Sequence, residues 1–168
     1  MGNVLLVVDM LVGFLEAGHN RYCGDGAREI IPNVKRLIEG EQAKGSQVFS
    51  ICDNHRPDDL EFEMFPVHCV MGTEEAEVIP KRRYSAFFET DLEERLAKLS
   101  PDKIIICGVC TDICVRHTAA DARNRDYLVE VPTDCVATFD PEAHTYAGQH
   151  MEKILEAKLV SIATSSTS

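Results

Sequence analysis

The sequence predicts an α/β fold, a three-layer αβα sandwich around a mostly parallel sheet of about five to six strands. Helix-like and strand-like segments alternate along the whole chain. The segments 4–8 and 104–107 are continuous apolar runs rich in β-branched residues, which is typical of strands buried on both faces. The 168 residues, 45% of them hydrophobic, suit a single domain over 1–168 with a sizeable core.

The individual elements follow from local patterns. Strands are predicted at the short apolar runs 4–8, 47–52, 78–80, 103–107, 127–131 and 158–162. Helices are predicted at 27–44, 92–99, 112–125 and 141–157. In the first of these, Ile30, Val34, Leu37 and Ile38 recur at helical spacing and form one apolar face. The polar residues 163–168 are expected to form a frayed tail.

Charge and cysteine usage exclude several functional classes. The net charge of −11 argues against a nucleic acid or an anionic membrane as partner, because either favours a basic surface. No apolar run approaches the roughly 20 residues that cross a bilayer, and the N-terminus lacks the basic region of a signal peptide. The seven cysteines are then expected to be reduced. We therefore expect a cytoplasmic protein.

Cys114 is the candidate nucleophile. It lies in the first turn of the helix that follows the strand 103–107, so the helix dipole is expected to lower its pKa toward neutrality. Backbone N–H groups in the turn 108–114 could form an oxyanion hole. The alternative is a buried structural cysteine, the commonest state of a free thiol.

A second pattern in the same stretch is the CxxC of Cys107 and Cys110. Such a spacing can form a redox pair or half of a zinc site. However, Cys107 falls inside the predicted strand, where its side chain should point into packed structure. No second CxxC occurs to complete a zinc site.

Two further residues could support a reactive thiol. Asp9 follows the first strand, and ligands bind beyond the carboxyl ends of strands in open parallel sheets. An aspartate that merely opens a solvated loop is the alternative. Lys81 begins a basic triplet in an acidic protein, and a solvated basic patch is its alternative.

The long connection after the second strand contains candidate metal ligands. Asp53, His55 and His68 offer a carboxylate and two imidazoles, a set that suits Zn²⁺, Fe²⁺ or Mn²⁺. A fourth ligand could be Glu61 or Glu63, and their spacing does not choose between them. Each of these residues alone would read as an ordinary polar residue of a loop.

Together these motifs resemble the nicotinamidase/isochorismatase-like family of cysteine hydrolases, in order and over nearly the whole chain. The matching stretches are Val7-Val8-Asp9-Met10 with Gly13-Phe14, Asp53-x-His55, Pro66-x-His68-Cys69-x-x-Gly72-Thr73, Lys81 with Tyr84-Ser85-Ala86-Phe87, and Gly108-x-x-Thr111-Asp112-x-Cys114-Val115-x-x-Thr118-Ala119-x-Asp121-Ala122. The last of these is the most specific. The resemblance implies the isochorismatase-like hydrolase fold.

The resemblance also assigns roles. It implies a catalytic triad of Asp9, Lys81 and Cys114, and an oxyanion hole formed by the backbone N–H groups of Cys110 and Cys114. In the family the peptide bond before the position of Cys110 is cis. The metal ligands would be Asp53, His55, His68 and Glu61; some members of the family have a histidine or water in place of the glutamate. The ion would be Zn²⁺, with Fe²⁺ or Mn²⁺ as alternatives.

The implied reaction is the deamidation of nicotinamide to nicotinate and ammonia by a homo-oligomeric enzyme. The chain contains no tryptophan, so stacking on the pyridine ring would rely on Phe14, Phe65 or Tyr84. Two alternatives stay open: a hydrolase of the same family acting on another small amide or carbamoyl compound, and a redox sensor that uses Cys107, Cys110 and Cys114. If the protein were an isochorismatase, Asp53, His55 and His68 would have no role.

Overall fold

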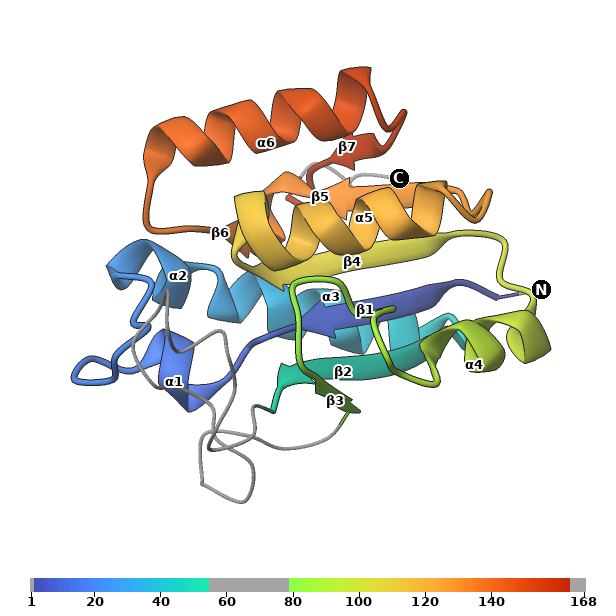
Figure 1. The fold of residues 1–168 in the computed structure, drawn as a ribbon, viewed down its shortest axis with the longest axis horizontal. Helices are drawn as coiled ribbons and strands as arrows, with labels where there is room; N and C mark the ends of the chain where they lie inside the picture. Colours follow the sequence, from blue (N-terminus) through green and yellow to red (C-terminus); the bar gives the residue numbers. More distant parts are fainter. Residues whose placement is uncertain (1, 55–78, 164–168) are drawn as a thin grey trace.

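One parallel sheet organises the structure, a computed structural model that describes residues 2–54 and 79–163 (Figure 1). Its strands are β1 (Val4–Val8), β2 (Gln47–Asp53), β3 (Ile79–Lys81), β4 (Ile104–Val109), β5 (Val129–Pro132), β6 (Val136–Ala137) and β7 (Lys158–Val160). Their order is β3-β2-β1-β4-β5-β7, with the short β6 paired to β4, and every pairing is parallel. The predicted α/β class and parallel sheet are confirmed.

The sheet order reverses at β1, which lies between β2 and β4. The chain passes from β1 to β2 on one side, and β4 later returns to pair with β1 on the other. At the carboxyl end of this pair, Val8 is in register with Ile51 and with Gly108. Open α/β sheets bind their ligands in the crevice at such a reversal. The residues that follow β1 and β4 are therefore the first place to look for a site.

Helices cover both faces of the sheet and complete the three predicted layers (Figure 1). They are α1 (Val12–Leu15), α2 (Asp25–Glu29), α3 (Ile31–Ala43), α4 (Leu92–Leu99), α5 (Arg116–Arg123) and α6 (Pro141–Lys153). One core cluster joins the sheet to α4, α5 and α6, and the other joins it to α1, α2 and α3. Among the described residues, no helix is both long and apolar enough to cross a membrane.

Several boundaries differ from the prediction. The single helix expected at 27–44 is two helices, because Pro32 has no N–H to continue α2 and instead fits the first turn of α3. The helix expected at 112–125 opens with a π-helical turn, Thr111–Val115, before α5 begins. Lys81 is the last residue of β3 rather than a loop residue. Of the expected tail, residues 164–168 lie outside the described part of the chain.

Candidate active site

Asp9 is held at the point where the sheet order reverses. It follows β1 directly and is fully buried. Its φ of 52° lies in the left-handed region, which aspartate tolerates better than most residues. Its backbone N–H donates to the carbonyl oxygen of Ile51 (2.7 Å), and its Oδ1 accepts from the backbone N–H of Asp53 (2.8 Å). Two contacts to β2 therefore fix the position of this carboxylate.

Lys81 joins Asp9 to two other buried groups. The side chain of Lys81 is fully buried, and its Nζ lies 2.9 Å from Asp9 Oδ2. The same Nζ donates to Asp53 Oδ1 and to Cys114 Sγ, the latter at 3.4 Å. β2 and β3 place Lys81 there, since Asp53 and Lys81 are in register. We call these four residues, Asp9, Asp53, Lys81 and Cys114, the Lys81 cluster.

Gly108 lets β4 reach this cluster. A side chain at this position would place its Cβ 1.9 Å from the carbonyl oxygen of Val8, and the φ of Gly108 is 113°. The peptide bond between Val109 and Cys110 is cis, as the resemblance to the cysteine hydrolase family implies. The carbonyl oxygen of Cys110 then accepts from the N–H groups of Ile113 and Val115, both at 3.1 Å. These contacts shape the turn that delivers Cys114 to Lys81.

The acid–base properties of the Lys81 cluster follow from its burial and its charges. Burial raises the pKa of Asp9, the neighbouring Asp53 raises it further, and Lys81 offsets part of the rise, so that it reaches about 6. Burial alone would lower the pKa of Lys81, but Asp53 and Asp9 together raise it well above its usual value. The ammonium group therefore stays charged at neutral pH.

The expected depression of the Cys114 pKa is wrong for this structure. Burial raises the pKa of Cys114 well above its usual value, and the carboxylates of Asp9 and Asp53 add to that effect against the opposing charge of Lys81. The dipole argument considered only the helix and not the two buried acids. The resting thiol is consequently protonated, and it needs a nearby base in order to ionise.

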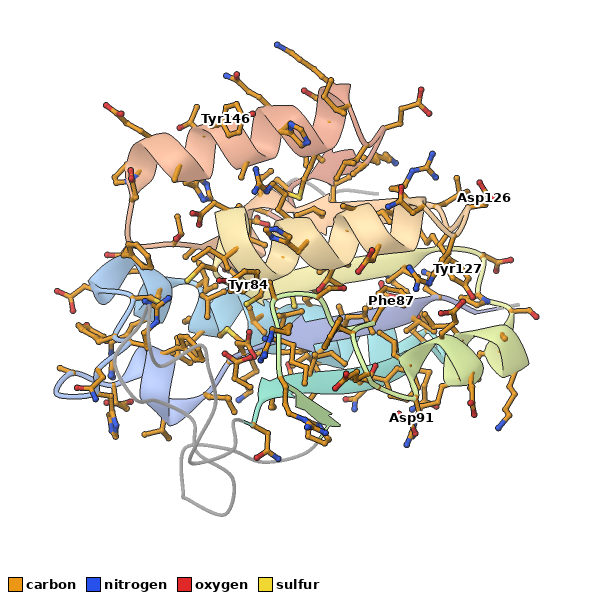
Figure 2. The ribbon with its side chains drawn as sticks, viewed as in Figure 1. Tyr84, Phe87, Asp91, Asp126, Tyr127 and Tyr146 are labelled. Carbon is orange, nitrogen blue, oxygen red and sulfur yellow. The ribbon has the colours of Figure 1, made fainter. Side chains whose placement is uncertain are left out.

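The three aromatic residues expected at the substrate, Phe14, Phe65 and Tyr84, lie in different parts of the chain's structure or outside the described residues. Phe14 is 3% exposed and packs in the core cluster that contains Cys110, not in the one that contains Cys114. Tyr84 lies at the N-terminal end of α5 (Figure 2), where its ring meets that of His117 with centroids 5.3 Å apart. Phe65 lies outside the described residues. Tyr84 is thus placed near the helix that follows Cys114.

Asp53 is the one predicted metal ligand that the structure describes, since His55, Glu61 and His68 lie in the undescribed range 55–78. Within 2–54 and 79–163, no group of three or more His, Cys, Asp or Glu side chains could hold a metal ion. Asp53 ends β2 and is 4% exposed, and its carboxylate is a suitable oxygen ligand for a divalent cation. It fits as one ligand, and its pairing with Lys81 is an additional role that the sequence did not suggest.

Two polar residues beside the site were not singled out from the sequence. Asn54 Oδ1 and Asp112 Oδ1 are buried, and neither has a hydrogen-bond partner within the described part of the chain. Asn54 is fixed through its backbone N–H, which donates to the carbonyl oxygen of Lys81 (2.9 Å). In the sequence, Asn54 follows Asp53, and Asp112 belongs to the motif that contains Cys114. Unpaired buried acceptors are costly, so both are candidates for contacts to a bound molecule.

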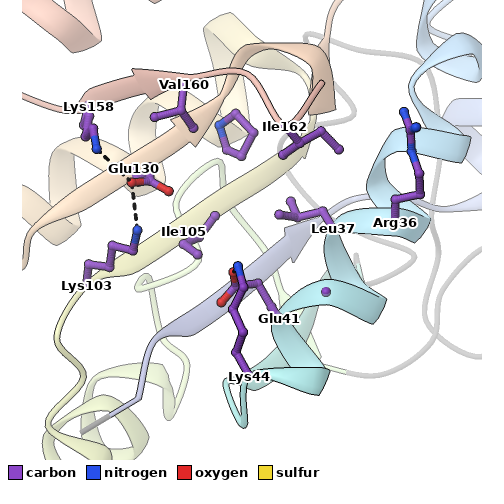
Figure 3. A pocket seen from close by; sticks show the side chains of 12 residues that line it. Arg36, Leu37, Glu41, Lys44, Lys103, Ile105, Glu130, Lys158, Val160 and Ile162 are labelled. Atoms are coloured by element: carbon purple, nitrogen blue, oxygen red, sulfur yellow. Dashed lines mark hydrogen bonds and ion pairs between the residues drawn. The ribbon is translucent and has the colours of Figure 1, made fainter. Parts of the chain in front are cut away.

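A separate cavity of about 410 Å³ lies elsewhere on the sheet (Figure 3). Its lining includes Lys103, Glu130 and Lys158, with Lys103 Nζ 2.8 Å from Glu130 Oε2. None of its lining residues belongs to the Lys81 cluster. This cavity is therefore separate from the Lys81 cluster, which lies at the carboxyl ends of β1, β2, β3 and β4.

The chain resembles known proteins over nearly its whole length. Residues 3–164 match the isochorismatase domain. The isochorismatase family protein PncA of Bacillus subtilis is 30% identical over 181 residues, covering 95% of this chain and 99% of that protein. The crystal structure of pyrazinamidase from Pyrococcus horikoshii in complex with zinc has a TM-score of 0.90 at 30% identity, covering 96% of this chain and 100% of that chain.

A third relative has a different named activity. N-carbamoylsarcosine amidase from Thermoplasma acidophilum superposes with a TM-score of 0.86 at 29% identity, covering 96% of each chain. The similar proteins thus share a fold but not one substrate. Taken with the match over residues 3–164, these similarities show that the chain belongs to the isochorismatase family of hydrolases.

Proposed function

We propose that this protein is a cysteine amidohydrolase that converts nicotinamide to nicotinate and ammonia through a thioester on Cys114. The observation that carries the proposal is the contact of Lys81 Nζ with Asp9 Oδ2 (2.9 Å) and with Cys114 Sγ (3.4 Å) in a buried site. A nucleophile, a base and a charge-compensating cation within contact of one another are what covalent amide hydrolysis requires.

Asp9 is the general base in this proposal. Because the Cys114 thiol is protonated at rest, its proton moves to Asp9 as Sγ attacks the carboxamide carbon. Lys81 keeps its charge throughout and stabilises the thiolate beside the carboxylate of Asp53, while Asp9 carries the proton. Without that cation, two anions, Asp53 and either Asp9 or the Cys114 thiolate, would lie together in a buried site.

The remaining steps use the turn after β4. The negative charge that develops on the amide oxygen would be held by the backbone N–H groups of Cys110 and Cys114, and one such donor is typically worth about 3–4 kcal/mol. Asp9 then returns its proton to the departing ammonia. It next takes a proton from the water that attacks the thioester. The C–S bond breaks, the proton passes from Asp9 to Cys114 Sγ, and nicotinate leaves.

A divalent metal ion, most simply Zn²⁺, would be held by Asp53 together with His55, His68 and Glu61. When bound, it would orient the pyridine nitrogen and withdraw electron density from the ring. The chain's own share in binding comes from Tyr84, with Phe14 and Phe65, which would contact the ring, and from the unpaired acceptors of Asn54 and Asp112. These acceptors could receive the two N–H bonds of a primary carboxamide.

Ammonia release from nicotinamide tests the proposal most simply. The purified protein is assayed after loading with Zn²⁺, Fe²⁺ or Mn²⁺ and after treatment with a chelator. We expect turnover of the metal-loaded protein and a large loss after chelation. The absence of ammonia release with all three ions would refute nicotinamide as the substrate.

A second candidate substrate is an N-carbamoyl amino acid, because the similar fold of N-carbamoylsarcosine amidase carries that activity. The same attack by Cys114 on a carbamoyl carbon would also release ammonia. Parallel assays with nicotinamide and N-carbamoylsarcosine distinguish the two, since the preferred substrate is the one with the higher kcat/KM.

A further inference from the structure

Two thiols meet beside the turn that follows β4. Cys23 Sγ and Cys110 Sγ are 3.3 Å apart, although the residues are separated by 87 positions in the sequence. Both residues are buried, with 2% and 3% of their surface exposed. The two sulfur atoms are in van der Waals contact but not bonded, since a disulfide bond is about 2.05 Å long.

Hydrogen bonds hold both residues in place. The backbone N–H of Cys23 donates to the carbonyl oxygen of Phe14 (2.9 Å), and its Sγ donates to the carbonyl oxygen of Arg21 (3.4 Å). Cys110 is fixed by the two N–H groups that its carbonyl oxygen accepts. The contact therefore joins the segment before α2 to the turn that delivers Cys114.

Cys23 is also the more acidic member of the pair. The hydrogen bond from Cys110 lowers the pKa of Cys23 against the effect of burial, and the charge of Arg21 helps. The same contact and burial raise the pKa of Cys110. Burial likewise raises the pKa of Cys107, and it raises that of Cys135 to about 12. Among these four thiols of one core cluster, Cys23 is the one most readily ionised.

We propose that Cys23 and Cys110 are an oxidation site, a dithiol that a hydroperoxide converts to a disulfide. The Cys23 thiolate attacks one peroxide oxygen and breaks the O–O bond, which gives a sulfenic acid and, with hydrogen peroxide, one water after protonation. Cys110 Sγ then attacks Cys23 Sγ, the S–S bond forms, and the hydroxyl group leaves as a second water. Both sulfurs are oxidised, the peroxide is reduced, and an external thiol reverses the change.

This assignment replaces the CxxC pairing that the sequence suggested. The thiol in contact with Cys110 is Cys23, whereas Cys107 lies within β4, fully buried in the core. Oxidation would also reach the active site, because Cys110 must move as its Sγ closes on Cys23. This last consequence rests on the proposed function, in which the N–H of Cys110 holds the oxyanion.

Disulfide mapping tests the oxidation site without any substrate. The tryptic peptide 104–116 contains Cys107, Cys110 and Cys114, so the Cys107→Ser/Cys114→Ala protein is used, in which that peptide retains Cys110 alone. After one equivalent of hydrogen peroxide and alkylation, we expect this peptide linked to peptide 22–28, which contains Cys23. Dithiothreitol should release it. Free, alkylated Cys23 and Cys110 after peroxide would overturn the proposal.

Matched variants complete the mapping in the otherwise unchanged chain. Cys23→Ser and Cys23→Ala should each abolish the linked peptide, whereas Cys135→Ser, at another buried thiol of the same core cluster, should not. Thermal unfolding of each variant verifies that it is folded. A bridge from Cys110 to Cys107 or Cys114 in the wild-type protein, identified by fragment ions, would refute the pairing.

Measurements of ammonia release distinguish oxidation of the Cys23–Cys110 pair from oxidation of Cys114. Once reduced protein releases ammonia from nicotinamide, peroxide should lower turnover by about tenfold or more, as expected for a displaced oxyanion donor. Dithiothreitol should restore it, and Cys23→Ser should lack this recoverable loss. A fully bridged protein with unchanged turnover would refute the link to the active site. If even the reduced protein is inactive, the proposed function fails while the mapping result stands.

Discussion

Two buried carboxylates lie at opposite ends of the same strands, Asp9 in the Lys81 cluster and Glu41 in α3, and their pKa values are shifted in opposite directions. Glu41 of α3 lies near the amino ends of β1 and β2 and is 3% exposed, compared with 0% for Asp9. Its Oε2 accepts from Ser46 Oγ (2.6 Å) and Asn3 Nδ2 (3.3 Å), and its Oε1 accepts from Lys44 Nζ (2.8 Å). Figure 3 shows Glu41 and Lys44 together at the edge of the separate cavity.

Burial raises the pKa of both carboxylates, but the net shifts are opposite. Burial alone would raise the pKa of Glu41, but hydrogen bonds from Lys44, Ser46 and Asn3 lower it below its usual value. The pKa of Asp9 rises to about 6, because burial and the neighbouring Asp53 both raise it and Lys81, which also pairs with Asp53, offsets only part of the rise. Burial therefore does not distinguish a reactive acid from a structural one. The difference lies in whether the surrounding donors and cations satisfy the charge.

The largest expected effect is at the thiol of the Lys81 cluster. Cys114→Ala should lower ammonia release by at least about 10⁴-fold, because it removes the group that forms the thioester. Its thermal unfolding midpoint and bound metal content should stay near those of the wild-type protein. Residual turnover above a few per cent would show that a different residue is the nucleophile.

The next effect concerns charge compensation. Lys81→Met keeps the length of the side chain but leaves two buried carboxylates facing each other, so we expect a loss of about 3–5 kcal/mol in unfolding free energy. The second change Asp53→Asn should restore much of that stability and none of the activity. Denaturant unfolding measures the stability of the single and the double variant, and ammonia release measures their activity. An unchanged stability of Lys81→Met would contradict the charge argument.

Glu41, with its partners Asn3, Lys44 and Ser46, is the structural counterpart of the Lys81 cluster. Glu41→Gln removes the charge but keeps the shape. One carboxylate oxygen becomes an NH₂ group, so a hydrogen-bond donor then faces the donor of Lys44 or Ser46. We expect a loss of about 1–3 kcal/mol in unfolding free energy with kcat and KM within about twofold of wild type. A large loss of kcat in a folded variant would mean that the two ends of the sheet are functionally coupled.

The smallest effect is in the pH dependence of stability, measured on chelated protein. The folded pKa of Asp9 is raised from 3.8 to about 6, so its contribution to stability falls as pH rises through about 6. The folded pKa of Glu41 is lowered from 4.5, so its contribution is lost as pH falls below 4.5. The unfolding free energy of each variant, Asp9→Asn or Glu41→Gln, is measured against pH and subtracted from that of wild type. The two difference curves should slope in opposite directions.

Much of this arrangement could be predicted from the sequence, because strand runs and motif spacing are local. The run Val4–Val8 and the position of Asp9 after it agree with β1, and the placement of Cys114 after β4 agrees with the expected turn. The fully apolar burial of both strands is a pattern that a parallel sheet imposes on consecutive residues.

The rest depends on contacts between residues far apart in the chain. The contact of Cys23 with Cys110 spans 87 positions and leaves no periodic signal. The raised pKa of Cys114 arises from its burial and from Asp9 and Asp53, none of which a helix-dipole argument includes. The pairing of Asp53 with Lys81 depends on the register of β2 and β3, which the sequence does not specify.

A covalent intermediate on Cys114 tests the central claim most directly. The metal-loaded protein is mixed with nicotinamide, quenched in acid over a series of short times, and examined by intact-mass and peptide mass spectrometry. The account predicts one added nicotinoyl group on the peptide that contains Cys114, absent from Cys114→Ala and removed by hydroxylamine. Steady release of ammonia with no adduct on Cys114 at any quench time would contradict it.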